Sequence, residues 1–263
     1  MEYILVTGAC GGMGKAAVKE LVNRGYGIFA LDKTKYEEAK NVIPIVADVT
    51  DPQSLKLAFE KVSLHTRKLY AIIHFAGIYM LNSLVEIENE AFENAFRINL
   101  FGAFNINKIF LPLLKEGSRI LITTSELAPL SPLPFTGLYA VTKSALDKYA
   151  YSLRMELQLL GIKVSVLRAG AVKTNMLGVS TAALDNFCAN TKLYLCNAER
   201  FKKIVNNVEA KNIPPEKLAK RAANILNKKH PKFAYAINRN PLLLLLNVLP
   251  SALQFWVIKQ ILK

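Results

Sequence analysis

The stretch "YILVTGACGGMGKAAVKELVNRG", residues 3–25, decides how this chain folds. A β-rich run at 3–7 turns directly, through clustered glycines, into a helical pattern at 13–23, and a strand–helix unit of a parallel sheet begins in this way. Glycine tolerates positive φ and lets the backbone approach a ligand, so the amide groups of such a turn and the helix N-terminus can hold a pyrophosphate. We therefore assign four residues of the turn to cofactor binding: Gly8, Gly12, Met13 and Gly14.

The same alternation of strands and helices continues along the chain. Further β-rich runs lie at 27–31, 42–47, 70–75, 119–124, 163–168 and 233–237. Helical patterns separate them at 52–63, 89–115, 138–160, 199–210 and 215–228. This order predicts an α/β protein with a doubly wound parallel sheet, a Rossmann fold, of about seven strands with helices on both faces. We expect a single dinucleotide-binding and catalytic domain at 1–240 and an apolar C-terminal tail at 241–263.

Composition and charge narrow the class of protein. Hydrophobic residues make up 52% of the chain and its mean hydropathy is +0.22, as a parallel sheet that is buried on both faces requires. The net charge is +14, and residues 192–263 hold 14 Lys and Arg against 3 Glu. Such a basic region fits an anionic membrane, nucleic acid or simple solubility. We expect no nucleic-acid partner, because the region contains no recognised binding module.

Cysteine usage and the N-terminus indicate a cytoplasmic protein. The three cysteines, Cys10, Cys188 and Cys196, form no CxxC pair and leave one thiol over in any pairing. This argues against a disulfide framework and a zinc site, so we expect no bound metal. The N-terminal residues also lack the pattern of a secretory leader.

The end of the second β-rich run indicates the type of dinucleotide. Asp32 follows this run, where a carboxylate can accept hydrogen bonds from both hydroxyls of the adenosine ribose and repel a 2′-phosphate. We therefore expect NAD, with NADP less favoured. Lys33 and Lys35 follow at once and can offset the repulsion, and the alternative is that Asp32 is an ordinary loop residue.

The segment "YAVTK", residues 139–143, carries the chemistry. On a helix, Tyr139 and Lys143 lie on one face and can point together at the carboxyl ends of the strands. A free tyrosine has a pKa of about 10, and we expect the ammonium to favour the phenolate, which makes Tyr139 a proton donor and acceptor. Ser125, at the end of the fifth run, can hydrogen-bond the same substrate oxygen while a hydride moves. A serine nucleophile is the rival reading, but no GxSxG surrounds Ser125.

Taken together, these motifs resemble the short-chain dehydrogenase/reductase family, and in particular its steroid and retinol dehydrogenase-like members, over roughly residues 1–240. "TGACGGMG", "INLFG" and "YAVTK" occur in the family's order. The resemblance implies that Asp48 and Val49 contact adenine, that Asn99 kinks its helix and holds a water linked to Lys143, and that Lys143 also binds the nicotinamide ribose. It further implies cofactor contacts at Ala76, Gly77, Tyr139, Val172 and Thr174.

Three features depart from the family's pattern. The usual NNAG is "HFAG", with His74 and Phe75 in place of both asparagines, and we expect His74 to be a hydrogen-bonded core residue. The usual PG after the sixth strand is "AG", residues 169–170. Ser125 lies fourteen residues before Tyr139, one more than the resemblance implies. Thr123 and Thr124 are the fallback hydroxyls, although strand alternation points Thr124 away from its neighbours.

The segments at 77–83 and 126–137, together with the residues after Thr174, should form the substrate site. They are rich in apolar side chains: Ile78, Tyr79, Met80, Leu127, Leu130, Leu133 and Phe135. We therefore predict a hydrophobic secondary alcohol or ketone, such as a steroid, a retinoid or a lipid-like molecule. The alternative is that these side chains pack against a lid.

The tail leaves three readings open: an interfacial helix on a membrane, a cap on the pocket, or a contact in a homo-oligomer. The uncharged run at 240–258 is long enough to suggest a membrane span, but Pro250, Asn247 and Gln254 interrupt it and argue against one. The resemblance also implies a homo-oligomer paired through the helices at 89–115 and 138–160. The rival to an enzyme is a non-catalytic, dinucleotide-sensing interaction protein, which the complete set of Asn99, Tyr139 and Lys143 argues against.

Overall fold

The computed structural model describes residues 1–209 and 211–263, without the side chains of 175–180, 208 and 209, so the end of the helix expected at 199–210 lies outside the described residues. Seven parallel strands form one sheet in the order β3-β2-β1-β4-β5-β6-β7. The strands are β1 Tyr3–Thr7, β2 Gly27–Asp32, β3 Val42–Val46, β4 Leu69–His74, β5 Leu114–Ser125, β6 Lys163–Ala169 and β7 Ala234–Ile237. The predicted doubly wound sheet is confirmed.

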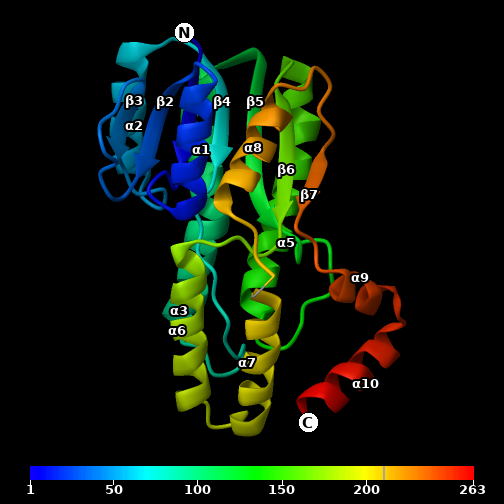
Figure 1. Ribbon diagram of the computed structural model, residues 1–263. Helices are drawn as coiled ribbons and strands as arrows, with labels where there is room; N and C mark the ends of the chain where they lie inside the picture. Colours follow the sequence, from blue (N-terminus) through cyan, green and yellow to red (C-terminus); the bar gives the residue numbers. More distant parts are fainter. Residues whose placement is uncertain (210) are drawn as a thin grey trace.

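Helices cover both faces of the sheet (Figure 1). One layer contains α1 Gly12–Asn23 and α8 Pro215–Leu226, and the other contains α2 Pro52–His65, α4 Gly102–Phe110 and α5 Gly137–Leu157. Because side chains alternate along a strand, Ile4 and Val6 of β1 pack towards α1 and α8, whereas Leu5 packs with residues of α4 and α5. The sheet therefore separates two apolar cores and brings all its strand ends to one edge.

The region expected to be one helix at 89–115 is divided. It consists of α3 Asn89–Phe96, a π-helical turn η1 Arg97–Phe101, α4, and a 3-10 turn η2 Leu111–Leu113. The buried Asn99 amide bonds the backbone of Ile78 inside the π-helical turn, and Pro112 occupies the last turn. β5 then begins at Leu114, earlier than the run expected at 119–124.

The segment after Thr174, in which a helix is expected only at 199–210, forms two helices below the strand ends (Figure 1). These are α6 Asn175–Asn190 and α7 Leu195–Glu209, which we call the lid. The lid has a core of its own, in which Phe135 lies 5.0 Å from Phe187 and 5.3 Å from Phe201 between ring centroids. The sequence pattern placed the start of α7 too late and gave no sign of α6.

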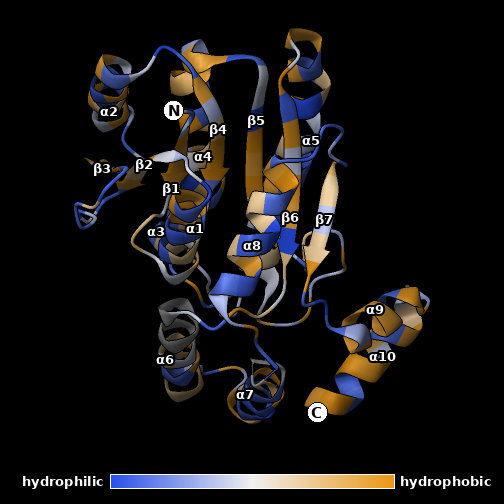
Figure 2. Cartoon of the chain, turned by 45° about the horizontal axis from the view of Figure 1, so that its top comes forward, coloured by the Kyte–Doolittle hydropathy of each residue, from blue (hydrophilic) through white to orange (hydrophobic). Residues whose placement is uncertain are grey.

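The C-terminal tail forms two short helices, α9 Pro241–Val248 and α10 Ser251–Leu262. The Asn240 side chain accepts the N–H of Leu242 at 2.9 Å and so caps α9, and Pro250 separates the two helices. Leu262 is buried against the lid core. Figure 2 shows how apolar both helices are. Across the described residues, the model contains no helix with the length and hydropathy of a membrane span.

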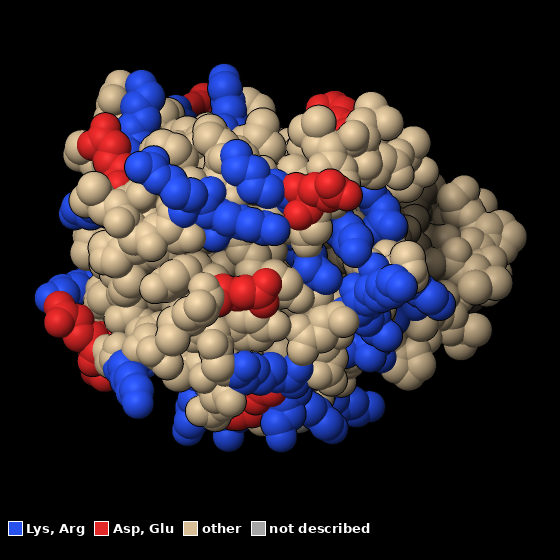
Figure 3. Space-filling model, turned by 90° about the horizontal axis from the view of Figure 1, so that it is seen from above, with Lys and Arg blue, Asp and Glu red and all other residues tan. Residues whose placement is uncertain are grey.

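Figure 3 shows the end of the molecule opposite the lid. Lys and Arg side chains are spread over this face among Asp and Glu side chains, whereas the lobe at the right, formed by α9 and α10, shows almost none. On this face, the positive charge is therefore distributed and does not form a single basic patch.

Candidate active site

The glycine-rich turn lies between β1 and α1. Gly8 has φ +67°, and a Cβ added there would lie 2.5 Å from the backbone nitrogen of Ala76. A Cβ on Gly12 would lie 2.8 Å from the Thr174 side chain. Only glycine fits at these two positions, because an added Cβ would clash with Ala76 or Thr174. Gly11, which precedes α1, has no side chain that could cap the helix. The turn thus presents free backbone amides at a helix N-terminus, which suits a dinucleotide pyrophosphate.

Asp32 ends β2 beside this turn. Its Oδ2 accepts the N–H of Cys10 at 3.0 Å and its Oδ1 accepts the N–H of Thr34 at 3.1 Å. Lys35 pairs with Glu38 at 3.1 Å, so its ammonium is partly engaged away from Asp32. The carboxylate is held in place and keeps lone pairs for further donors.

Asp48 and Val49 follow β3 next to Asp32. The N–H of Ala47 donates to the Asp32 carbonyl at 3.0 Å, and Asp48 Oδ1 accepts both the N–H and the hydroxyl of Thr50. Val49 packs against Gly102, where an added Cβ would lie 2.7 Å from the valine. Asp48 and Val49, the residues expected at the adenine, therefore lie at the same edge of the sheet as Asp32, the carboxylate expected at the ribose.

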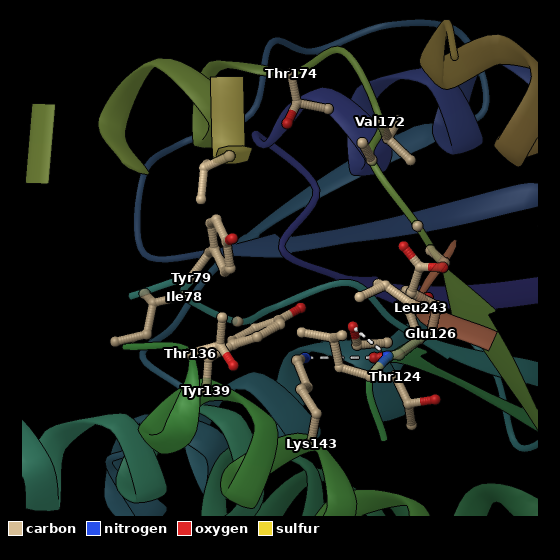
Figure 4. Close-up of a pocket in the computed structure, with 18 of the residues that line it drawn as sticks. Ile78, Tyr79, Thr124, Glu126, Thr136, Tyr139, Lys143, Val172, Thr174 and Leu243 are labelled. Carbon is tan, nitrogen blue, oxygen red and sulfur yellow. Dashed lines mark hydrogen bonds between the residues drawn. The ribbon is translucent and has the colours of Figure 1, made fainter. Parts of the chain in front are cut away.

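Tyr139 and Lys143 lie in the first turns of α5, at the floor of a cavity (Figure 4). Lys143 Nζ is 5.8 Å from the centre of the Tyr139 ring and donates to the carbonyl of Thr123 at 3.5 Å. Ser125 lines the same cavity, and its hydroxyl acts on the pKa of Tyr139. The three groups expected from the sequence are thus brought together.

The pKa values differ from expectation. Burial, together with the charge of Glu126, raises the pKa of Tyr139 to about 12, although the Ser125 hydroxyl acts to lower it. Burial lowers the pKa of Lys143 to about 8. The expectation that the pKa of Tyr139 lies below its usual value is wrong for this structure, because desolvation of the phenolate exceeds every other influence.

Asn99 is buried within the π-helical turn. Its Oδ1 accepts the N–H of Ile78 at 2.8 Å, and its Nδ2 donates to the Ile78 carbonyl and to Thr142 Oγ1. A Cβ on Gly77 would lie 3.0 Å from Asn99 Oδ1 and 3.3 Å from Lys143 Nζ. The Asn99 amide and the Lys143 ammonium therefore both lie close to the backbone of Gly77.

The neighbouring hydroxyls and histidine have surroundings of their own. Thr124 lines the cavity, but its Oγ1 donates to Asp147, which also binds Arg168 at 2.7 Å, so this hydroxyl is already engaged. Thr123 Oγ1 is buried and has no hydrogen-bond partner among the described residues. His74 Nε2 bonds Asn107 at 2.9 Å, and burial lowers its pKa to about 4. His74 is a neutral core residue.

Val172 and Thr174 face the cavity from the segment after β6. Val172 pairs with Ile213 in a parallel bridge whose hydrogen bonds are made by Ala171 and Lys173. In such a bridge the central residue directs its own N–H and C=O the other way. Thr174 lies at the N-cap of α6 without a capping bond from its side chain. Both residues have the polar groups a carboxamide requires.

The cavity encloses about 190 Å³. Ile78, Tyr79, Leu127 and Leu133 line it as expected. Phe135 instead packs into the lid core, as the alternative reading allowed. Met80 and Leu130 are not among the residues that line the cavity.

Sequence reasoning missed several lining residues. They are Glu126, Phe201, Ile204, Val205 and Leu243. The last four come from the lid and from α9, which no motif marks. Glu126 lies in the segment at 126–137, which is predicted to border the substrate because of its apolar residues. A single acid in such a segment is the signal that could have identified Glu126 as a lining residue.

The described residues contain no cluster of three or more His, Cys, Asp or Glu side chains that could hold a metal ion. Cys10, Cys188 and Cys196 are free thiols.

The fold and this cavity define the class: a doubly wound α/β protein with a candidate ligand site where its parallel strands end. The family model described as short chain dehydrogenase matches residues 2–185, and the chain belongs to this family. The resemblance expected from the motifs is confirmed. The family consists of oxidoreductases that use NAD(H) or NADP(H).

Known proteins agree with this assignment. Estradiol 17-beta-dehydrogenase 2 of Mus musculus is 33% identical over 189 residues, which cover 67% of this chain and 50% of that protein. The chain thus spans about half the length of this relative. The 3-ketodihydrosphingosine reductase of Bacteroides thetaiotaomicron is 25% identical over 88% of this chain and 86% of its own. A crystal structure of 3-ketoacyl-(acyl-carrier-protein) reductase from Brucella melitensis with NADH shares the fold, with a TM-score of 0.73, 19% identity and coverage of 90% and 96%.

Proposed function

We propose that this protein transfers a hydride between a nicotinamide cofactor and a hydrophobic secondary alcohol or ketone. The observation that carries the proposal is the convergence of Ser125, Tyr139 and Lys143 on an apolar cavity beside a glycine turn built for a pyrophosphate. A dinucleotide-sensing protein without catalysis has no need for a buried phenol and ammonium at this point.

Each polar group has a role that follows from its position. The bound cofactor supplies or accepts the hydride. Tyr139 exchanges a proton with the substrate oxygen, and Ser125, which lines the same cavity, orients that oxygen. Lys143 stabilises the phenolate when charged, and Asn99, with its bonds to Ile78, keeps the ammonium end of the site polar.

We infer that the cofactor is NAD. Asp32 is fixed beside the turn by Cys10 and Thr34 and would repel a 2′-phosphate. The ion pair of Lys35 with Glu38 weakens the compensation that the lysine could provide. Asp48 and Val49 would border the adenine, whereas Ala76, Gly77, Val172 and Thr174 would border the nicotinamide half.

The substrate class rests on the cavity wall. Most of the wall is aliphatic or aromatic, with few polar groups beyond the reacting end. The names of the two curated relatives refer to a steroid and a sphingoid ketone, which agrees with a steroid, retinoid or lipid-like substrate here.

An alcohol and ketone panel, followed at the nicotinamide absorbance with NAD and NADP separately, tests this function. We expect turnover of hydrophobic secondary alcohols or ketones and higher kcat/KM with NAD. An inactive panel, from protein that still binds NADH, would favour the sensing role.

We extend the proposal to the tail, as both a cap on the cavity and a peripheral contact with membrane. Leu243 of α9 lines the cavity, and Asn247 accepts the N–H of Ser131 at 2.7 Å. The two helices of the tail also expose large apolar side chains: Leu242, Leu245, Val248, Phe255, Trp256 and Ile261. Trp256 is the single tryptophan, so its emission should shift to the blue on anionic vesicles. An unchanged spectrum, together with a concentration-dependent dimer, would assign this surface to a second copy.

A homo-oligomer through α4 and α5 is the remaining part of the proposal. These helices expose Phe104, Val141, Tyr151 and Met155, and exposed apolar side chains on two neighbouring helices suit a symmetric contact. Met155→Glu should reduce the mass measured by sedimentation. A monomeric wild-type protein would exclude this contact.

A further inference from the structure

Glu126 is an acid in an otherwise apolar part of the cavity. It follows Ser125 directly, and only 6% of its surface is exposed. Figure 4 shows Glu126 and Leu243 towards one end of the cavity, Ile78 and Tyr79 towards the other, and Tyr139 between them. A buried carboxylate without partners costs several kcal/mol, so its retention there requires an explanation.

The protein satisfies only part of this carboxylate. Oε2 accepts the N–H of Asn240 at 2.6 Å. Among the described residues, no Lys or Arg forms an ion pair with Glu126, and no hydrogen bond to Oε1 is present. A carboxylate has about four acceptor sites, so acceptor capacity remains for a ligand.

The backbone makes room for this acid. A Cβ on Gly170 would meet the Asn238 carbonyl first and would also lie 3.0 Å from Glu126 Oε1, so the glycine, which the Asn238 backbone requires, leaves space for the oxygen as well. Gly170 also lines the cavity. Burial raises the pKa of Glu126, while the Asn240 bond and the charge of Arg239 lower it. The charge of Glu126 also acts on Tyr139, which places the acid within electrostatic reach of the reacting group.

We propose that Glu126 determines substrate specificity by binding a hydrogen-bond-donating group, an ammonium or a hydroxyl, near the reacting carbon of an otherwise apolar substrate. The inference rests on the proposed function and narrows its substrate class. Glu126 and Tyr139 line the same cavity, and the charge of the acid acts on the phenol, so one small substrate can contact both groups. A substrate that places only hydrocarbon next to Glu126 would remove water from Oε1 without giving it a hydrogen-bond donor.

Matched alcohols test the proposal with the NAD-loaded protein. The probes are dodecan-3-ol, 2-aminododecan-3-ol, 1-aminododecan-3-ol and dodecane-2,3-diol. We expect kcat/KM for at least one donor-bearing probe to exceed that of dodecan-3-ol by about tenfold or more, as a desolvated polar pair allows. Equal values for all four probes would overturn the inference.

Glu126→Gln separates the charge from the tail contact, because the amide oxygen can still accept the Asn240 N–H. The preference for the amino probes should fall to within about threefold of unity, while the diol keeps more of its advantage. Asn240→Pro removes the N–H from Oε2 and should retain the preference; Asn240→Ala, which removes only the cap of Leu242, is its control. If E126Q retains the preference and Asn240→Pro abolishes it, Glu126 is only an anchor of the tail and the proposal is wrong.

Calorimetric binding of the same probes to the NADH-loaded protein distinguishes this inference from the proposed function. Preferential binding of a donor-bearing probe, without turnover of any probe, would refute the function and support the Glu126 site. Turnover with equal binding of all probes would support the function and refute the site. Glu126→Asp, which keeps the charge on a shorter chain, serves if the Gln variant does not fold.

Discussion

The floor and the roof of the cavity differ in chemistry and in how the sequence encodes them. The floor, at the strand ends and the start of α5, holds Ser125, Tyr139 and Lys143, and Asn99 lies next to it against Gly77; all four are within the family match at 2–185. The roof consists of Phe201, Ile204 and Val205 from α7 and Leu243 from α9, all beyond that match. By the proposed function the floor carries the reaction, whereas the roof lies outside the family match and would border the substrate.

The largest expected effect is on the floor. Tyr139→Phe removes the proton that the proposal requires and should lower kcat by about 10²–10⁴-fold, measured with the best alcohol of the panel. NADH binding, followed by fluorescence, should change little. Tyr151→Phe, the same change at an exposed site of α5, is the control. Similar kcat for both variants would end the assignment of Tyr139.

The roof should fail in a different way. Leu184 is fully buried in the lid core, and Leu184→Ala should destabilise it by about 2–5 kcal/mol through the cavity left behind. Hydrogen exchange should accelerate in α6 and α7 while NADH binding persists, because the floor is unchanged. Leu193→Ala, at a 64% exposed position between the lid helices, is the matched control. Loss of NADH binding in the Leu184 variant would show that floor and roof fold as one unit.

The buried ammonium makes the floor sensitive to pH. Burial lowers the pKa of Lys143 to about 8 from 10.5. Between these values the unfolded chain binds more protons than the folded one, so stability should rise with pH through this window. From pH 8 to 9.5 the gain should be about 1–2 kcal/mol. Urea unfolding should show it in wild type and not in Lys143→Met; the same pH dependence in both would place its origin elsewhere.

The smallest effect is expected at the outer edge of the floor. Asp32→Ser removes the negative charge beside the adenosine ribose and should raise the NADP to NAD ratio of kcat/KM by about tenfold. Glu37→Ser, the same loss of charge five residues further on, should leave the ratio near that of wild type. A wild-type preference for NADP would contradict the role of Asp32 directly.

The difference between floor and roof also explains what could be predicted. Gly8, Tyr139 and Lys143 belong to local patterns whose chemistry depends on spacing, so the glycine turn and the cluster on α5 followed from the sequence. The lid did not, because α6 and α7 are stabilised by long-range contacts, such as Phe135 with Phe201, that no local pattern contains. The pKa of Tyr139 could not be predicted either, since the burial that raises it comes from tertiary packing, such as the contact with Tyr79.

The central claim, that this cavity supports hydride transfer, has a direct test. NADH labelled with deuterium at the transferable position of the nicotinamide is incubated with a hydrophobic ketone and the protein, and the product is examined by mass spectrometry. The account predicts one deuterium on the new carbinol carbon with wild-type protein and strongly reduced product with Tyr139→Phe. Product without deuterium, or equal labelled product from both proteins, would contradict it.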